Sequence, residues 1–376
     1  MLSGTRWMLR LRVLVVAALL VAPACGGGGG GAGAAGKKGQ PVQLTIGYQP
    51  YYTQAWSGVA MRGKEFWKKY LPEGSTVTFQ VGLQGAVIVS QLLAGKQQIG
   101  YMGDMPSLVA TSKRQTRDLR IVATLGMAQD QCNIILARSD APEFASPEKA
   151  IQWMNGKTVA TPQGSCTDRF TQAVFQKFGV NPSAYLNQSI EVISSNFQNR
   201  RIDAATVWEP VAARLVNSGL AKRVASGVNF NENDAGFLVV SKELLDGRPD
   251  VVEAYLKAEL EAQQWVADPA NAMELARLAV SQTEGYTVKD MWDAMFAVAP
   301  GGNPGDLSNR MPFIVDQQVQ GLVDSSWAFL NKVKVIAQPT PLEGIVQDGI
   351  ARTVLTKSGA AFPVQVKHLP KSDFKG

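Results

Sequence analysis

The sequence predicts an α/β fold made of two lobes, with a largely parallel sheet. Short apolar segments typical of buried strands alternate with segments whose apolar residues recur at helical spacing. This order of strand, loop and helix occurs in residues 42–126 and again in residues 127–228. From residue 42 onward the chain is long enough for two domains of about 100 to 200 residues each.

The first 25 residues predict export. Three arginines flank an apolar run, residues 13–21, which is shorter than the roughly 20 residues that a membrane-spanning helix needs. Small residues precede Cys25, and a glycine-rich linker, residues 26–41, follows it. The segment resembles a bacterial lipoprotein signal, in which the cysteine carries the lipid, so we expect a membrane tether there. Ordinary signal cleavage nearby is the alternative.

The charge of the chain gives no sign of a nucleic-acid partner. The formal net charge is +6, and removal of residues 1–24 deletes three arginines and no acids, which lowers it to +3. Several of the remaining lysines lie near the C-terminus instead of forming a basic face. We therefore expect no nucleic-acid binding.

The expected elements follow the chain in order. The first lobe has strands at residues 42–48, 76–81, 99–102 and 120–125 and helices at 56–70 and 87–93. The second lobe has strands at 133–137, 158–161, 191–193 and 202–207 and a helix at 147–154. The chain then returns to the first lobe over residues 229–336, with a strand at 237–240 and helices at 251–266, 272–280, 289–296 and 315–331. A C-terminal extension, residues 337–376, has one helical run, 345–355, and no predicted role.

The segment 156–180 predicts a candidate binding loop. A buried strand is broken at Pro162–Gly164, and a helix follows with Ser165 as its N-cap and Gly179 at its end. A helix that begins beyond the carboxyl end of a strand favours an anionic or polar ligand group. Asp168 fits a capping role at this helix better than a ligand contact.

Each lobe also places an acid near the carboxyl end of a strand, where open α/β sheets bind ligands. Asp104 precedes Pro106, so a helix-capping role and a ligand contact are equally consistent with the sequence. Glu209 precedes Pro210, and because glutamate is a poor N-cap we favour a position in the cleft.

Four motifs, in this order, resemble those of a known family. They are LTIGYQP (Leu44–Pro50), QLLAGKQQIGYMGDMPSLVA (Gln91–Ala110), GKTVATPQGS (Gly156–Ser165) and RRIDAATVWEP (Arg200–Pro210). These motifs are similar to those of the solute-binding proteins of ABC importers for nitrate, sulfonate, taurine and related solutes. The resemblance covers residues 42–225 and extends less clearly to residue 336.

The resemblance implies a two-lobed periplasmic-binding-protein fold of type II, which closes on a small molecule in the interlobe cleft and delivers it to a membrane permease. It also implies an extracytoplasmic protein, which we expect to be a monomer without cofactor or metal. The residues that it places in the cleft are Gln49, Tyr51, Tyr52, Gln84, Gly85, Asp104, Met105, Gln163, Gly164, Ser165, Cys166, Thr167, Trp208 and Glu209.

The acids expected at the cleft narrow the choice of solute class. Asp168 and Glu209 disfavour a bare inorganic anion, because a buried acid needs a cationic or donor partner. A solute with both an amine and an acid group, or a neutral polar heterocycle, fits better than nitrate. Taurine-like compounds are therefore our first choice and pyrimidine-like thiamine precursors our second.

An enzyme of the same fold that acts in pyrimidine synthesis is the main alternative. The only histidine, His368, lies in the C-terminal extension, so Ser–His and Cys–His nucleophilic arrangements have no support. We expect a binding protein. A surface receptor that feeds a signalling partner is a third option, which the chain alone does not separate from transport.

Two cysteines remain once Cys25 is assigned to the lipid. Cys132 begins the strand after the first crossing between lobes, and Cys166 lies in the candidate binding loop. Export favours a disulfide between them, whereas two buried free thiols are the alternative.

Overall fold

The two crossings of the chain between its sheets organise the fold. The computed structural model describes residues 36–298 and 302–376, all within the unit Gly31–Gly376. β4 (Leu119–Ala128) leads out of the first sheet and β10 (Asp234–Ser241) leads back into it, so these neighbours are antiparallel. β5 (Ile134–Arg138) and β9 (Ala221–Ser226) are antiparallel in the second sheet for the same reason. Both sheets are therefore mixed, and the prediction of a largely parallel sheet was wrong at the crossing strands.

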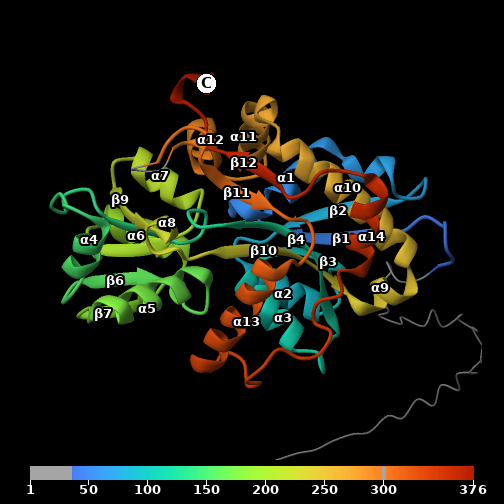
Figure 1. Ribbon diagram of the computed structural model, residues 1–376, viewed down its shortest axis with the longest axis horizontal. Coiled ribbons are helices and arrows are strands. Elements are labelled where there is room, and N and C mark those ends of the chain that lie inside the picture. The colour runs from blue at the N-terminus through green and yellow to red at the C-terminus, as the bar shows by residue number, and fades with distance from the viewer. Residues whose placement is uncertain (1–35, 299–301) are drawn as a thin grey trace, which may run out of the picture. The chain divides into compact units, whose positions relative to one another are not determined.

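The first lobe is built on a seven-stranded sheet with the order β12-β11-β4-β10-β3-β1-β2 (Figure 1). Its other strands are β1 (Gln43–Tyr48), β2 (Thr76–Val81), β3 (Ile99–Gly103), β11 (Leu307–Met311) and β12 (Val364–Lys367). Its helices are α1 (Trp56–Lys64), α2 (Gly85–Leu93), α3 (Asp104–Ser112), α9 (Lys242–Gly247), α10 (Pro249–Ala267), α11 (Ala272–Ser281), α12 (Val288–Phe296), α13 (Gln317–Lys332) and α14 (Gly349–Ser358). Because β12 pairs with β11, the C-terminal segment is part of this sheet.

The second lobe is built on a five-stranded sheet with the order β7-β6-β8-β5-β9. Its other strands are β6 (Thr158–Thr161), β7 (Ala184–Asn187) and β8 (Ala204–Val207). Its helices are α4 (Pro147–Trp153), α5 (Cys166–Phe178), α6 (Ile190–Gln198) and α7 (Val211–Asn217). The short helix α8 (Gly227–Phe230) lies in the second crossing.

One predicted strand, residues 191–193, was wrong because it belongs to helix α6. The hydroxyl of Ser189 accepts a hydrogen bond from the amide of Val192 and caps this helix. Ile190, Ile193 and Phe197 are buried at helical spacing. The predicted helix 56–70 is also shorter, because Glu65 adopts a left-handed conformation after α1.

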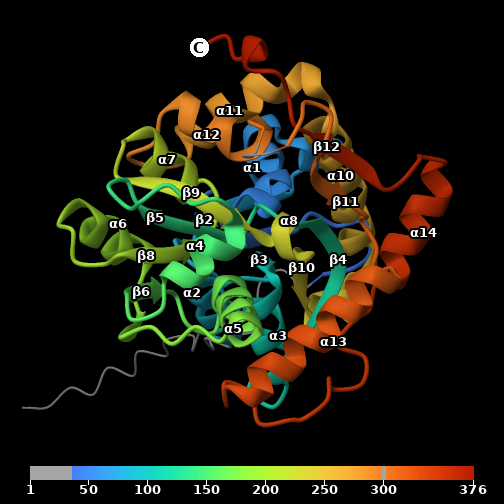
Figure 2. The ribbon, with the colours of Figure 1, turned by 60° about the vertical axis from the view of Figure 1, so that its left-hand side comes forward.

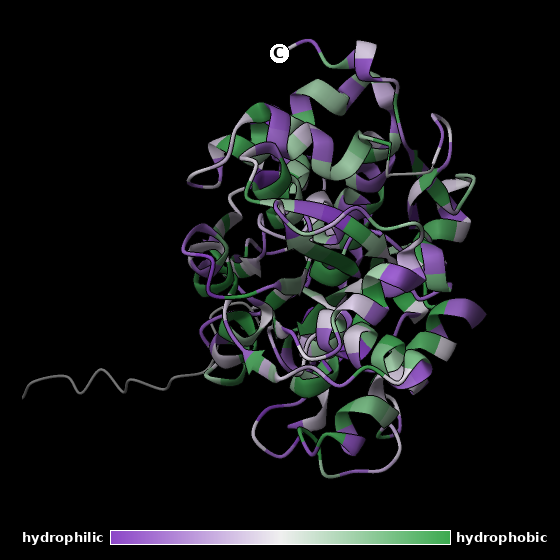
Figure 3. Cartoon of the chain, turned by 90° about the vertical axis from the view of Figure 1, so that its left-hand side faces the viewer, coloured by the Kyte–Doolittle hydropathy of each residue, from purple (hydrophilic) through white to green (hydrophobic). Residues whose placement is uncertain are grey.

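Apolar side chains of both lobes fill the space between the sheets and their helices. Trp56, Trp292 and Trp327 are almost completely buried there. Figure 3 shows that the outer helices mix hydrophobic and hydrophilic positions, as expected for helices buried on one face. None of the described helices is both long and apolar enough to cross a membrane. The predicted signal segment and Cys25 lie outside the described residues.

The second crossing requires a glycine at position 227, and substitution can test this requirement. The amide of Gly227 donates to the carbonyl of Asn133 in the other crossing. A Cβ atom at Gly227 would lie 2.3 Å from the carbonyl oxygen of Gln129 and 2.2 Å from that of Glu232. We expect Gly227→Ala to lower the free energy of unfolding by about 1–3 kcal/mol, because backbone must move to admit the methyl group.

Gly321→Ala is the matched control, because Gly321 lies in α13 and a Cβ there meets nothing within 4 Å. It should leave stability unchanged or raise it by up to about 1 kcal/mol. Urea unfolding of the two variants measures the difference. Equal midpoints would show that the crossings adjust freely.

Candidate functional site

A cavity of about 370 Å³ lies between the two lobes. The loops after β1 and β2, the start of α2 and the start of α3 line it from the first lobe, and the loop before α5 lines it from the second. Figure 2 shows the ribbon turned so that the second lobe, with α5, comes forward. The lining residues are Gln49, Tyr52, Gln84, Gly85, Ala86, Val89, Ser90, Gly103, Pro106, Val109, Pro162, Gln163, Gly164, Ser165, Cys166, Trp208 and Val335.

Each lobe directs the beginning of a helix at this cavity. Gly85 begins α2, whose N-cap residue Gln84 makes no side-chain cap. Cys166 begins α5 after the N-cap Ser165. The first amides of a helix have no partner within it and carry a partial positive charge, so both ends can bind a negative or polar ligand group. The carboxylate of Asp168 in the first turn of α5 offsets part of the positive charge there, whereas α2 has no acid in its first turn.

The rest of the lining is neutral. Among the described residues that line the cavity there is no Asp, Glu, Lys, Arg or His. Its polar side chains are amides and hydroxyls, and Oε1 of the buried Gln49 has no hydrogen-bond partner among the residues that the structure describes. Valine, proline and tryptophan side chains supply much of the remaining wall. The cavity can therefore hold an organic molecule with one polar end and an apolar body.

Nine of the fourteen residues predicted for the cleft line this cavity. They are Gln49, Tyr52, Gln84, Gly85, Gln163, Gly164, Ser165, Cys166 and Trp208. Tyr51, Asp104, Met105, Thr167 and Glu209 lie behind the wall. Sequence reasoning missed Val335, for which no local signal exists, and the residues of α2 and α3 next to those it named.

Asp104 is fully buried and its carboxylate is occupied by the protein. One oxygen accepts from the amide of Met105 at 2.7 Å, and the other accepts from the hydroxyl of Ser326 at 3.1 Å. The guanidinium of Arg169, from α5 of the other lobe, lies 4.0 Å away. Burial raises the pKa of Asp104, and Arg169 opposes this shift. Gly103, and not Asp104, is the N-cap of α3.

Glu209 is also turned away from the cavity. One carboxylate oxygen accepts from the amide of Ala213 at 2.9 Å in the first turn of α7, and the other pairs with Arg223 of β9. Burial raises the pKa of Glu209 to about 7, although Arg223 acts in the opposite direction. The side chain thus serves the start of a helix, the role that we had considered less favoured.

The other three residues behind the wall support it. The ring of Tyr51 packs against Tyr286, with centroids 5.7 Å apart. The hydroxyl of Thr167 lies 2.7 Å from that of Thr161 and 2.6 Å from that of Ser165. Met105 is fully buried in the apolar core. None of the three side chains is free to reach a solute without local rearrangement.

Asp168 anchors the candidate binding loop from behind. Its carboxylate accepts from the amide of Gly164 at 2.8 Å and from the hydroxyl of Tyr185 at 2.6 Å. Its own amide donates to the hydroxyl of Ser165 at 3.4 Å. The residue therefore has the capping role that the sequence favoured, but it reaches back to Gly164 and not to the N-cap.

A disulfide joins the first crossing to the same loop. The structure pairs Cys132 with Cys166, whose Cα atoms are 6.3 Å apart. The buried carboxylate of Asp234 lies within 4.8 Å of both sulfur atoms and accepts a hydrogen bond from Tyr52 at 2.8 Å. Burial raises the pKa of Asp234 well above its usual value. Because the two sulfurs are bonded to each other, this group is not arranged as a metal site.

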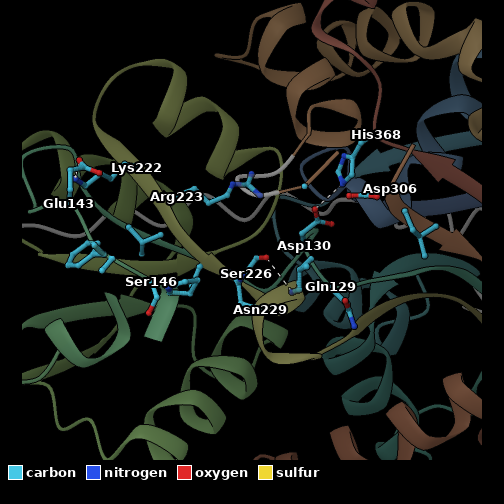
Figure 4. Close-up of a pocket in the computed structure, with 18 residues that line it drawn as sticks. Gln129, Asp130, Glu143, Ser146, Lys222, Arg223, Ser226, Asn229, Asp306 and His368 are labelled. Atoms are coloured by element: carbon cyan, nitrogen blue, oxygen red, sulfur yellow. Dashed lines mark hydrogen bonds and ion pairs between the residues drawn. The ribbon is translucent and has the colours of Figure 1, made fainter. Parts of the chain in front are cut away.

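A larger cavity, of about 730 Å³, lies beside the crossings, but none of the predicted site residues lines it. Most of its charged side chains pair with one another or with residues behind the wall. Lys222 pairs with Glu143, and His368 lies 3.3 Å from Asp130 (Figure 4). The carboxylate of Asp306 accepts a hydrogen bond only from the amide of Asn303 among the described residues. Because most of these charges are already paired and no predicted site residue lies here, the smaller cavity is the better candidate site.

Comparison with known proteins places the chain in a family. The model of the NMT1-like family matches residues 37–280. The taurine-binding periplasmic protein of Escherichia coli is 28% identical over 254 residues, which are 64% of this chain and 74% of that protein.

Two solved structures share the fold. The alkanesulfonate-binding protein SsuA from Xanthomonas axonopodis pv. citri, bound to MOPS, is 18% identical with a TM-score of 0.64, over 82% of this chain and 99% of that one. The desulfurization enzyme DSZB is 15% identical with a TM-score of 0.61, over 84% of this chain and 99% of that one. At these identities the two structures establish a shared two-lobed fold.

The disulfide can be tested by alkylation. We expect no label at Cys132 or Cys166 in the folded protein without reductant, and label at both after reduction and unfolding, by intact-mass analysis. Replacing both by alanine should lower the free energy of unfolding by about 2–4 kcal/mol, because the bridge restricts the unfolded chain. Label at both cysteines without reductant would contradict the bridge.

The raised pKa of Glu209 predicts a pH dependence of stability. The carboxyl titrates at about 7 in the folded protein, against 4.5 for its ordinary value, so the folded state binds more protons between these limits. The contribution of this proton binding to the free energy of unfolding is fully present below pH 4.5 and is lost as pH rises through 7. The total loss is at most about 3 kcal/mol.

The Glu209→Gln variant lacks this titration. Its stability relative to wild type should therefore improve as pH rises from about 5 to 8, as measured by urea unfolding across that range. A constant difference between the two proteins would show that Glu209 is ionised throughout.

Proposed function

This chain belongs to the NMT1-like family, and from that premise we propose that it is the solute-binding component of an ABC importer for a small organic sulfonate. It would capture the solute in the interlobe cavity outside the cytoplasm and deliver it to a membrane permease. The relative that binds taurine supports this class of solute. Anchoring through a lipid on Cys25 and a monomeric state are part of the proposal.

The observation that carries the proposal is the pair of helix beginnings, α2 and α5, that meet at one cavity from opposite lobes. A sulfonate spreads one negative charge over three oxygens, so it can accept from several amides at once. Closure of the lobes would bring both sets of amides onto the same group. The cavity size lies within the range of small-molecule sites, about 300–1,000 Å³, which exceeds what a bare inorganic anion needs.

Within the sulfonates, the geometry favours a solute without an amine. Taurine carries an ammonium group, which needs an acid or several acceptors when it is buried. Asp104 and Glu209 are both engaged within the protein and do not line the cavity. Apolar side chains such as Val89 and Val109 suit an alkyl or aryl group instead. We therefore place alkanesulfonates ahead of taurine.

Binding, and not catalysis, is the activity that the lining supports. The hydroxyls of Tyr52, Ser90 and Ser165 donate hydrogen bonds within the protein. The described lining residues include no Asp, Glu, Lys, Arg or His, and the only cysteine among them is in a disulfide. General acid–base or nucleophilic catalysis would need such a group within reach of the solute. Solute recovered chemically unchanged after incubation, by mass spectrometry, supports this reading, and turnover would contradict it.

The proposal predicts a ligand-dependent stabilisation. A panel of alkanesulfonates, taurine, nitrate and pyrimidines should contain a sulfonate that stabilises the protein by about 2.7 kcal/mol at a hundredfold excess over its dissociation constant. Thermal unfolding followed by titration calorimetry measures this effect. A panel in which no sulfonate shifts the transition would contradict the proposal.

A charge placed at the beginning of α2 tests the anion position. Ala86 lies in the first turn of α2 and lines the cavity. Ala86→Asp should keep the fold, since an acid suits a helix N-terminus, but lower sulfonate affinity at least about tenfold by repulsion. Ala86→Asn has nearly the same shape as Ala86→Asp without its charge, so it controls for the added bulk and should retain clearly more affinity than Ala86→Asp. Equal affinities of the two variants would place the anion elsewhere.

A further inference from the structure

Val335 lies in a rigid turn that follows α13. The amide of Val335 donates to the carbonyl of Leu330 at 2.9 Å, and that of Lys334 donates to Asn331 at 3.0 Å. Lys334 has a φ of 65°, in the left-handed region. These features define a Schellman motif, which fixes the backbone at the end of a helix.

The neighbours of Val335 hold this turn against the first lobe. Ile336 is 3% exposed and lies in the apolar core that contains Trp327. The indole N–H of Trp327 donates to the backbone carbonyl of Gln338 at 2.9 Å. The side-chain amide of Asn331 donates to the backbone carbonyl of Ala337 at 3.0 Å. The turn is thus anchored on both sides of Val335.

Val335 itself is not packed in this core. Its side chain is 39% exposed, although an apolar residue at this position of the motif commonly packs against the helix. It lines the interlobe cavity opposite Gly164, where an added Cβ would lie 3.7 Å from a methyl carbon of Val335. Residue 335 also lies beyond residue 280, where the match to the family model ends.

Val335 stands between two hollows. Together with Gln163 and Gly164 it lines the interlobe cavity of about 370 Å³ and an adjacent hollow of about 660 Å³. Phe175 and Tyr185 contribute aromatic side chains to the adjacent hollow. A larger side chain at 335 would extend this wall, and a smaller one would join the two spaces.

We propose that Val335 is a specificity-determining residue, which closes the cavity where it adjoins the neighbouring hollow, opposite Gly164, and sets the length of the solute's apolar part. The inference rests on the proposed function and adds to it a limit on solute size. The helix beginnings would hold the sulfonate, and the alkyl chain would extend towards Val335. A chain too long for the cavity would meet a side chain whose backbone does not yield.

The test is a series of linear alkanesulfonates of increasing length, titrated calorimetrically into wild type, Val335→Ala and Val335→Phe. In wild type, affinity should rise roughly fourfold per methylene, the ratio expected for burying one CH₂, and then fall beyond a limiting length. Val335→Ala should move this limit to longer chains, and Val335→Phe should move it to shorter ones. Thermal unfolding of the free proteins confirms that the variants fold.

Val192→Ala is the matched control, because Val192 is 45% exposed on α6 and does not line the cavity. Its length profile should follow wild type. The same limiting length in all four proteins would overturn the role of Val335 while leaving the proposed function intact. If no alkanesulfonate binds wild type, the proposed function fails, and this inference fails with it.

Discussion

The pairing of the two crossing segments is the constraint on which the rest of the structure depends. The amide of Gly227 donates to the carbonyl of Asn133, and the side chain of Asn133 donates to the carbonyl of Glu232. The segments by which the chain leaves the first sheet and returns to it are therefore joined by hydrogen bonds. The bridge from Cys132 to Cys166 extends this connection to the loop before α5. The disulfide thus fixes the position of the candidate binding loop relative to the crossings.

The sequence predicted best those features whose signals are local. The strand, loop and helix around Ser165 came out as expected, because a capping hydroxyl and the left-handed Gly179 act within a few residues of the ends that they define. The segment 191–193 was assigned wrongly for the converse reason. A short apolar run fits a strand or one turn of a helix, and the cap at Ser189 decides between them.

The environment of each acid could not be predicted from neighbouring residues. Asp104 receives a hydrogen bond from Ser326, which is 222 positions away, and Glu209 pairs with Arg223 on a strand that sequence reasoning had missed. The sequence predicted that each acid lies near the end of a strand. The direction of its side chain depends on partners that only the fold supplies. Val335 reaches the cavity in the same way, from a segment remote in sequence from every motif.

A neutral cavity that receives two helix beginnings has consequences for capture and release. Each beginning acts as about half a positive charge, and although Asp168 offsets part of it at α5, their amides can bind one oxyanion without a buried lysine or arginine. In the empty state no full charge is left unpaired in the wall, and a buried unpaired charge would be costly. Opening of the lobes would separate α2 from α5 and halve this attraction. A binder built in this way can hold its solute when closed and release it when open, because both helix beginnings act on the same group only while the lobes are together.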